Sequence, residues 1–199
     1  MATWLPAAWR RLRRPGAASV GNARWRVFAA SCALLGLAAH LALLPWFVWR
    51  GVPELVLYNL ATLPVYLFAA WVFVLRPGSP RRWHFIGTLG VGLELAGQGL
   101  LATWLLGWGS GFHYYLLLVP LVVLFSPFGR PVQRAALSAA VGVAYLLLWD
   151  ASGRHAPAYA LDPDELRGYL AANFALVFVV VMAIGFLFER AATRMEAEL

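Results

Sequence analysis

Six apolar stretches, each long enough to cross a lipid bilayer, constrain this chain more than any other feature. They fall at residues 27–48, 54–75, 83–106, 112–127, 132–149 and 166–188. A helix needs about 20 apolar residues to span the hydrocarbon core at a rise of about 1.5 Å per residue. Charged residues make up 13% of the chain, against roughly a quarter in a soluble domain. The sequence therefore predicts an all-α, polytopic membrane protein, folded as a bundle of six transmembrane helices.

The distribution of arginines predicts how this bundle is oriented. One side of the predicted bundle carries Arg10, Arg11, Arg13, Arg14, Arg24, Arg26, Arg76, Arg81, Arg82, Arg130, Arg134, Arg190 and Arg194. The other side carries Arg50, Arg154 and Arg167, together with Asp150, Asp162, Asp164 and Glu165. The positive-inside rule then places both termini in the cytoplasm, with the chain in a bacterial inner membrane. The net charge of +7 is accounted for by this topology, and we expect no nucleic-acid partner.

The chain divides into three predicted parts. Residues 1–26 form a basic cytoplasmic arm, residues 27–188 form the transmembrane domain, and residues 189–199 begin a cytoplasmic connector. Because no glycine or proline follows Phe188, we expect the last helix to continue past the membrane. Phe188, Ala192, Met195 and Leu199 have the a/d spacing of a coiled coil, although an ordinary amphipathic helix end fits this spacing equally well.

Polar residues inside the apolar stretches mark a candidate site. Glu94 is the one carboxylate expected within the membrane, and Gln98 lies one turn away on the same helix face. Gly87, Gly90 and Gly97 share that face, where they allow another helix or a ligand to approach closely. An ionisable residue at this depth costs at least about 2.5 kcal/mol on insertion scales. We therefore expect Glu94 either to fix helix packing, by bonding His40 or an asparagine, or to bind a ligand or ion.

Further polar residues are predicted in the same half of the bundle. Counting at about 1.5 Å per residue places His40, Asn59, Gln98 and Asn173 roughly 9–14 Å below the outer surface. His113 and Tyr114 lie at the outer mouth of the fourth stretch. The candidate ligand pocket therefore comprises Glu94, Gln98, His40, His113, Asn59, Tyr114 and Asn173. Haem ligation by His40 and His113 is a minor alternative. The single cysteine, Cys32, excludes an intrachain disulfide and a cysteine-based metal cluster.

The segment Gly107-Trp-Gly-Ser-Gly111 places a serine close to His113, as in intramembrane serine proteases. Those enzymes need Gly-x-Ser-Gly within a helix and a base from another helix, whereas Trp108 occupies the first glycine position here. The cytoplasmic segments contain no nucleotide-binding motif and no phosphate-binding loop. We therefore expect this chain not to be an enzyme, and we expect no cofactor.

The run Leu105-Leu-Gly-Trp-Gly-Ser-Gly-Phe-His-Tyr-Tyr-Leu-Leu-Leu118, preceded by Glu94, resembles the six-span membrane sensor region of bacterial nucleotide cyclases. The segment Phe188-Glu-Arg-Ala-Ala-Thr-Arg-Met-Glu-Ala-Glu-Leu199 is similar to the connector that leads from such anchors to a class III adenylate cyclase domain. Related anchors precede diguanylate cyclase and histidine kinase domains. This resemblance covers all the apolar stretches loosely and these two segments specifically.

The resemblance implies a sensor that perceives an outer-side or intramembrane ligand, either a small molecule or a lipid-like compound. The sixth helix would pass the signal to a cytoplasmic output domain in the same chain, an adenylate cyclase being favoured. Arg190, Arg194, Met195 and Leu199 would carry this signal, in a homodimer surrounded by membrane lipid. The alternative is a small six-helix transporter or permease that uses Glu94 as a proton or cation site.

Overall fold

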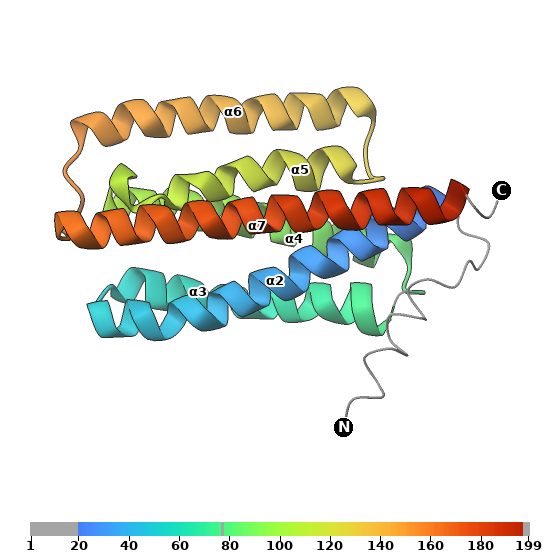
Figure 1. Ribbon diagram of the computed structural model, residues 1–199, viewed down its shortest axis with the longest axis horizontal. Helices are drawn as coiled ribbons and strands as arrows, with labels where there is room; N and C mark the ends of the chain where they lie inside the picture. Colours follow the sequence, from blue (N-terminus) through green and yellow to red (C-terminus); the bar gives the residue numbers. More distant parts are fainter. Residues whose placement is uncertain (1–19, 77, 197–199) are drawn as a thin grey trace.

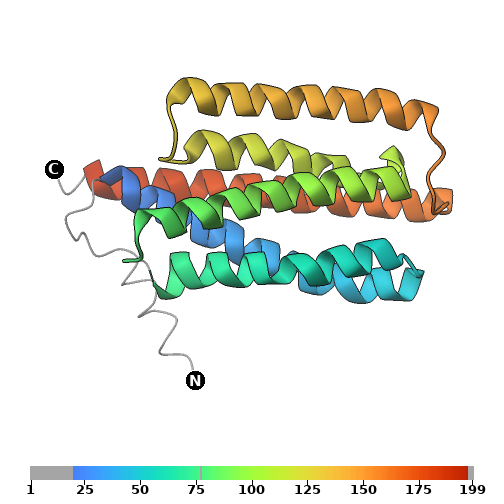
Figure 2. The same ribbon diagram turned by 180° about the vertical axis from the view of Figure 1, so that it is seen from behind.

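The computed structural model describes residues 20–76 and 78–196, and every regular element in those ranges is helical. The elements are α2 (Val20–Arg50), α3 (Pro53–Ala70), the π-helical η1 (Trp71–Leu75), α4 (Arg81–Leu106), the 3₁₀ stretches η2 (Trp108–Ser110) and η3 (Phe112–Leu117), α5 (Leu118–Phe125), α6 (Pro131–Arg154) and α7 (Pro163–Glu196). The long helices run side by side along one axis (Figures 1 and 2). The all-α fold is thus confirmed.

Five segments are long and apolar enough to cross a membrane. They are Trp25–Arg50, Pro53–Leu75, Arg81–Leu106, Pro131–Arg154 and Pro163–Phe186. The predicted span at 112–127 is instead a shorter apolar helix, Phe112–Phe125. It is short because Gly111, at φ 79°, turns the chain before Phe112, and because Ser126 is already extended at its other end. The described residues therefore contain five helices of membrane length, rather than the six predicted.

The bundle has two distinct ends. Helix α2 begins and α7 ends at the same end, which we call the termini end (Figure 1). The α2–α3 connection, η2 and the α6–α7 connection lie at the opposite end, which we call the hairpin end (Figures 1 and 2). Helix α2 starts several residues before the predicted position 27. Helix α7 continues without interruption to Glu196, as predicted from the absence of glycine and proline after Phe188.

The face of α4 that carries Gly87, Gly90 and Gly97 packs against the segment formed by α3 and η1. A Cβ atom at Gly97 would lie 2.1 Å from the hydroxyl oxygen of Tyr58, and one at Gly90 would lie 2.9 Å from Val65. At Gly87 the nearest side chain is that of Phe73, 3.3 Å away. The prediction that these glycines admit a neighbouring helix is confirmed, and that neighbour is the α3–η1 segment. This close approach brings the middle of α3 against Glu94.

Helix α6 lies at the outside of the bundle, over α5 (Figure 1). Leu148 is its only buried residue, and Leu137, Val143, Leu146 and Leu147 are exposed. An apolar surface of this kind is suited to contact with lipid chains rather than water. The interior that positions the candidate site is formed instead by α2, α3, α4, α5 and α7.

Candidate functional site

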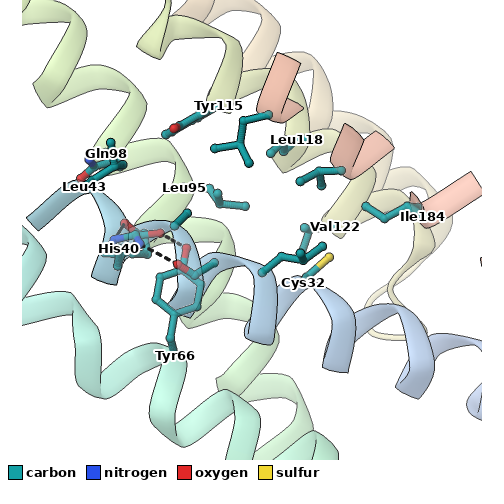
Figure 3. Close-up of a pocket in the computed structure, with 16 residues that line it drawn as sticks. Cys32, His40, Leu43, Tyr66, Leu95, Gln98, Tyr115, Leu118, Val122 and Ile184 are labelled. Atoms are coloured by element: carbon teal, nitrogen blue, oxygen red, sulfur yellow. Dashed lines mark hydrogen bonds and ion pairs between the residues drawn. The ribbon is translucent and has the colours of Figure 1, made fainter. Parts of the chain in front are cut away.

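A cavity of about 50 Å³ lies inside the bundle, bounded by α2, α3, α4, α5, α7 and the 3₁₀ stretch η3 (Figure 3). This volume is larger than the roughly 10–15 Å³ that a single water needs. Most of its wall is aliphatic. The lining residues are Cys32, Leu35, Gly36, Ala39, His40 and Leu43 of α2, Tyr66 of α3, Glu94, Leu95 and Gln98 of α4, Tyr115 of η3, Leu118 and Val122 of α5, and Leu176, Val180 and Ile184 of α7. Glu94, Gln98 and His40, three of the predicted site residues, are therefore brought together.

Glu94 is 2% exposed and both of its carboxylate oxygens are engaged. Its Oε1 lies 2.8 Å from His40 Nε2, and its Oε2 accepts a hydrogen bond from the hydroxyl of Tyr66. The other ring nitrogen of His40, Nδ1, lies 3.0 Å from the carbonyl oxygen of Gly36. A carbonyl can only accept, so Nδ1 carries a proton. One further proton then lies between His40 and Glu94, and the pair has no net charge wherever that proton resides.

This cancellation explains how a carboxyl group is accommodated in an apolar bundle. A lone charge at this depth would be costly, whereas a neutral, hydrogen-bonded pair removes most of that cost. The structural interpretation of Glu94, in which it bonds His40, matches this geometry. The hydroxyl of Tyr58 also donates to the backbone carbonyl of Glu94 at 3.0 Å, which ties α3 to α4 at the same level.

Tyr66 is the member of this cluster that the sequence did not reveal. Its hydroxyl reaches Glu94 because α2 has a glycine opposite it, and a Cβ at Gly36 would lie 2.0 Å from Tyr66 Cε1. Its ring also packs against His40, with the centroids 4.7 Å apart. The available signal was the position of Tyr66 in the interior of its span, away from either interface.

Gln98 differs from Glu94 because none of the described residues forms a hydrogen bond with its side chain. The residue is fully buried and lines the cavity, yet neither its amide nitrogen nor its amide oxygen has a hydrogen-bond partner. Leaving a buried polar group unpaired costs about 1–3 kcal/mol. The amide thus offers one donor group and one acceptor to a molecule in the cavity.

The cavity is polar at one end and apolar at the other. Gln98, His40 and Tyr66 lie at one side of the view in Figure 3, whereas Cys32, Val122 and Ile184 lie at the other. Cys32 is two helical turns from His40, a distance of about 12 Å along α2. Such a shape matches an elongated molecule with a polar head and an aliphatic chain.

The remaining predicted site residues lie outside the cavity wall. Asn59 is buried and donates to the carbonyl of Leu55 at 2.9 Å, within its own helix. Asn173 accepts from the Tyr115 hydroxyl at 2.8 Å and donates to the carbonyl of Ser110 at 2.8 Å. It therefore joins α7 to the wall residue Tyr115 and to the turn that contains Ser110. Its role is to connect elements rather than to contact the cavity.

His113 and Tyr114 belong to an aromatic cluster next to that turn. The His113 ring stacks on Trp108, with centroids 3.8 Å apart, and Tyr114 packs against both His113 and Phe174. His113 Nδ1 is buried without a partner. Both ring nitrogens of His40 are engaged, so this geometry gives no support to joint haem ligation by His40 and His113. Within residues 20–76 and 78–196, no three metal-ligating side chains gather into a metal site.

Ser110 is occupied by a local contact. Its Oγ donates to the carbonyl of Gly107 at 2.6 Å, which closes the η2 turn. Gly111 follows at φ 79°, and a Cβ there would lie 3.0 Å from the Cα of Leu170. The glycine-aromatic segment thus serves here as a tight turn against α7.

Three contacts fasten the hairpin end. Arg50 pairs with Glu165, linking α2 to α7. The hydroxyl of Tyr159 donates to Glu54 at 2.7 Å, and this bond to a carboxylate raises the pKa of Tyr159. The backbone N–H of Tyr159 donates to the carbonyl of Leu105 at 3.0 Å. The connection between α6 and α7 is thereby held against α3 and α4.

The predicted transmission residues lie at the termini end of α7. Arg190 is exposed, with its guanidinium 5.8 Å from the ring centroid of Phe186. Arg194 and Met195 fall within the helical range of α7. Leu199 lies outside the described residues.

Comparisons with known proteins identify no relative of this chain. No protein-family model matches the chain, and neither a curated protein nor a solved structure matches it.

Proposed function

We propose that this chain is a membrane sensor and anchor domain that binds a small amphipathic ligand in the central cavity. The ligand state would be passed along α7 to a cytoplasmic nucleotide cyclase, with an adenylate cyclase favoured. The resemblance of residues 105–118 and 188–199 to cyclase anchors supports the choice of output. The five membrane-length helices and the helical extension of α7 to Glu196 are consistent with it.

The observation that carries this proposal is the unpaired amide of Gln98. A purely structural polar residue would be satisfied by its neighbours, as the carboxylate of Glu94 and the amide of Asn173 are through their side-chain hydrogen bonds. Gln98 instead faces a cavity whose remaining wall is largely aliphatic. A neutral head group that both donates and accepts, such as an amide or an alcohol, would satisfy it.

Helix α7 contributes the wall that would convert binding into a signal. Leu176, Val180 and Ile184 line the cavity and lie two turns apart from first to last. They are all aliphatic, so they would contact the ligand chain rather than its head. A ligand that binds one position of α7 better than another shifts the population toward that position. The uninterrupted helix then carries the change to the termini end.

We also propose six crossings with both termini in the cytoplasm. The crossing added to the five membrane-length helices is the η3–α5 segment, the fourth in chain order. Its 3₁₀ residues rise about 2 Å each and its α residues about 1.5 Å. Its length of roughly 24 Å approaches the hydrocarbon thickness of about 30 Å. Arg81, Arg82, Arg130 and Arg134 at the termini end agree with the positive-inside rule.

The experiment is a fusion of the full chain to a class III adenylate cyclase catalytic domain. The length of the junction between them is varied one residue at a time. Cyclic AMP formation is recorded with straight-chain primary amides and alcohols of four to eight carbons. We expect one chain-length class to change activity, and Gln98→Leu to remove that response while keeping basal activity. Gln133→Leu, the same change at an exposed residue of α6, serves as the matched control. An equal response of Gln98→Leu and the unmodified fusion would reject the proposal.

A second candidate is a small transporter that uses Glu94 as a proton or cation site. The buried pair of Glu94 and His40, which shares one proton, favours it. Proteoliposomes would separate the two functions, since a transporter must move protons or cations in a way that Glu94→Gln abolishes. A sensor would show no such flux.

A further inference from the structure

A second cavity lies on the outside of the bundle, between α4, α5 and α6. Its volume is about 330 Å³, and it forms a groove because α6 packs over the short α5. Figure 2 shows these three helices running side by side. The groove shares the wall residue Val122 with the central cavity, but none of the polar residues of that cavity lines it.

The groove is apolar along most of its length. On α4 its wall runs from Phe85 to Ala96, which corresponds to about 16 Å of helix. That length is close to the depth of one leaflet, about half of the 30 Å hydrocarbon core. Gly92 deepens the middle of the groove, because no atom lies within 4 Å of where its Cβ would be. The dimensions are those of one extended acyl chain.

The termini end of the groove is basic. Arg134 lines it, and Nη1 of its guanidinium donates to the carbonyls of Leu124 and Ser126 at the end of α5. Its Nε is shielded from solvent and has no hydrogen-bond partner. Arg81 of α4 reaches the loop at the same end, where its Nη2 donates to the carbonyl of Pro127 at 3.4 Å and its guanidinium lies 5.6 Å from the ring of the groove residue Phe128. A phosphate would satisfy the free donor of Arg134 and the charges of both residues.

No carboxylate neutralises these arginines. Between Arg76 and Arg134 the only acidic residue is Glu94, which is paired with His40 inside the bundle. Elsewhere in the described residues, the carboxylates Glu54, Asp150, Asp162, Asp164 and Glu165 belong to the hairpin end. Glu189 and Glu196 are at the termini end, but they belong to α7, which does not line the groove. Within residues 20–76 and 78–196, no carboxylate therefore lines the groove beside these arginines.

We propose that this groove binds one anionic phospholipid, with an acyl chain along α4 and the phosphate on Arg134 and Arg81. Basic pockets between transmembrane helices on the cytoplasmic side bind anionic head groups in this manner. A second copy of the chain fits less well, because it would need an acidic surface at the same membrane depth. Lipid occupancy fills the space between α5 and α6 and holds α6 against the bundle.

The test is native mass spectrometry of the full chain, delipidated in detergent and titrated with phosphatidylglycerol or with phosphatidylcholine of the same acyl chains. We expect phosphatidylglycerol to bind about ten times more tightly, through the charge-assisted contacts of Arg134. Arg134→Gln should remove this preference. Arg154→Gln, at the hairpin end, should keep it.

A second pair of variants covers the case in which Arg134→Gln does not fold. Gly92→Leu fills the groove and should weaken phosphatidylglycerol binding. Gly142→Leu is the matched control, because Gly142 of α6 also faces open space but does not line the groove, so binding should be unchanged. Equal binding of the two lipids, or unchanged binding in both Arg134→Gln and Gly92→Leu, would overturn the proposal. So would a lipid-free dimer that Gly92→Leu disrupts, since the occupant would then be a second copy.

Discussion

At the scale of single residues, polarity inside the bundle is handled in two opposite ways. Glu94 is fully engaged by His40 and Tyr66, and the shared proton leaves the cluster without net charge. Gln98, one turn away, has no partner in the protein. The first arrangement stabilises the fold, and the second leaves a place for another molecule.

Replacing Glu94 tests the first arrangement. Glu94→Leu leaves the Tyr66 hydroxyl and His40 Nε2 without their shared partner, and we expect the free energy of unfolding to fall by about 2–5 kcal/mol. The measurement is unfolding of the purified protein by sodium dodecyl sulfate in mixed micelles, followed by circular dichroism. Glu54→Leu is the control, because Glu54 is an exposed carboxylate whose partner Tyr159 is also a tyrosine but lies in the loop at the hairpin end, outside the buried cluster. Equal losses in the two variants would contradict the buried cluster.

Sequence reasoning found part of this cluster. Glu94, Gln98 and His40 could be predicted because a polar residue inside an apolar stretch demands an explanation. Tyr66 lies in the interior of its span, which sets it apart from tyrosines at the interfaces, but its bond to Glu94 could not be predicted because the two residues lie on different helices. The unpaired state of Gln98 was equally hidden, because satisfaction depends on which side chains meet in three dimensions. Asn173 has the same polarity as Gln98, but its amide nitrogen and oxygen are both hydrogen-bonded, whereas Asn59 is bonded through its nitrogen alone.

At the scale of elements, the turn between α4 and α5 determines the shape of the bundle. Gly111 adopts a left-handed conformation and lies against α7, so the following helix starts in 3₁₀ form and remains short. The sequence predicted a membrane span at 112–127, and the helical segment found there, Phe112–Phe125, is close to those bounds but below membrane length and begins in 3₁₀ form. Apolarity reports the environment of a segment, whereas the rise per residue depends on the helix type, which turn geometry decides. Long helices such as α4 and α6 were predicted closely because their apolar runs extend over the whole element.

This turn can be tested with two neighbouring glycines. Gly111→Ala forces a side chain into φ 79° and toward Leu170, and we expect a loss of roughly 1–2 kcal/mol in unfolding free energy from the backbone conformation alone. Gly109→Ala is the matched control, because its Cβ would make an ordinary contact of 3.5 Å with Leu166. Thermal unfolding in detergent compares the two. A Gly111→Ala protein as stable as Gly109→Ala would show that the turn does not require a glycine.

At the scale of the whole molecule, the two ends of the bundle differ in charge as well as in architecture. The termini end carries Arg81, Arg82, Arg130 and Arg134, whereas the hairpin end carries paired charges such as Arg50 with Glu165. The proposed ligand cavity lies between these ends, and α7 runs past it toward the termini end. This arrangement carries a signal from the cavity to the cytoplasm only if the termini end faces the cytoplasm.

Orientation is measurable with single cysteines. In a Cys32→Ser background, Ala158→Cys places a thiol at the hairpin end and Ser79→Cys places one between η1 and α4. We expect a membrane-impermeant maleimide to label Ala158→Cys in intact spheroplasts, and to label Ser79→Cys only after the membrane is broken. The reverse pattern would invert the topology. Labelling of both in intact spheroplasts would contradict six crossings.

The most direct test of the ligand site is a binding isotherm for octanamide on the full chain in lipid nanodiscs, read from the fluorescence of its tryptophans. We expect saturable binding by the unmodified protein. Gln98→Leu should weaken it at least tenfold, since about 1.4 kcal/mol corresponds to a factor of ten and the amide contact contributes that much or more. Gln133→Leu should bind as the unmodified protein does. Binding that is equally strong in Gln98→Leu would contradict the assignment of the cavity as a ligand site.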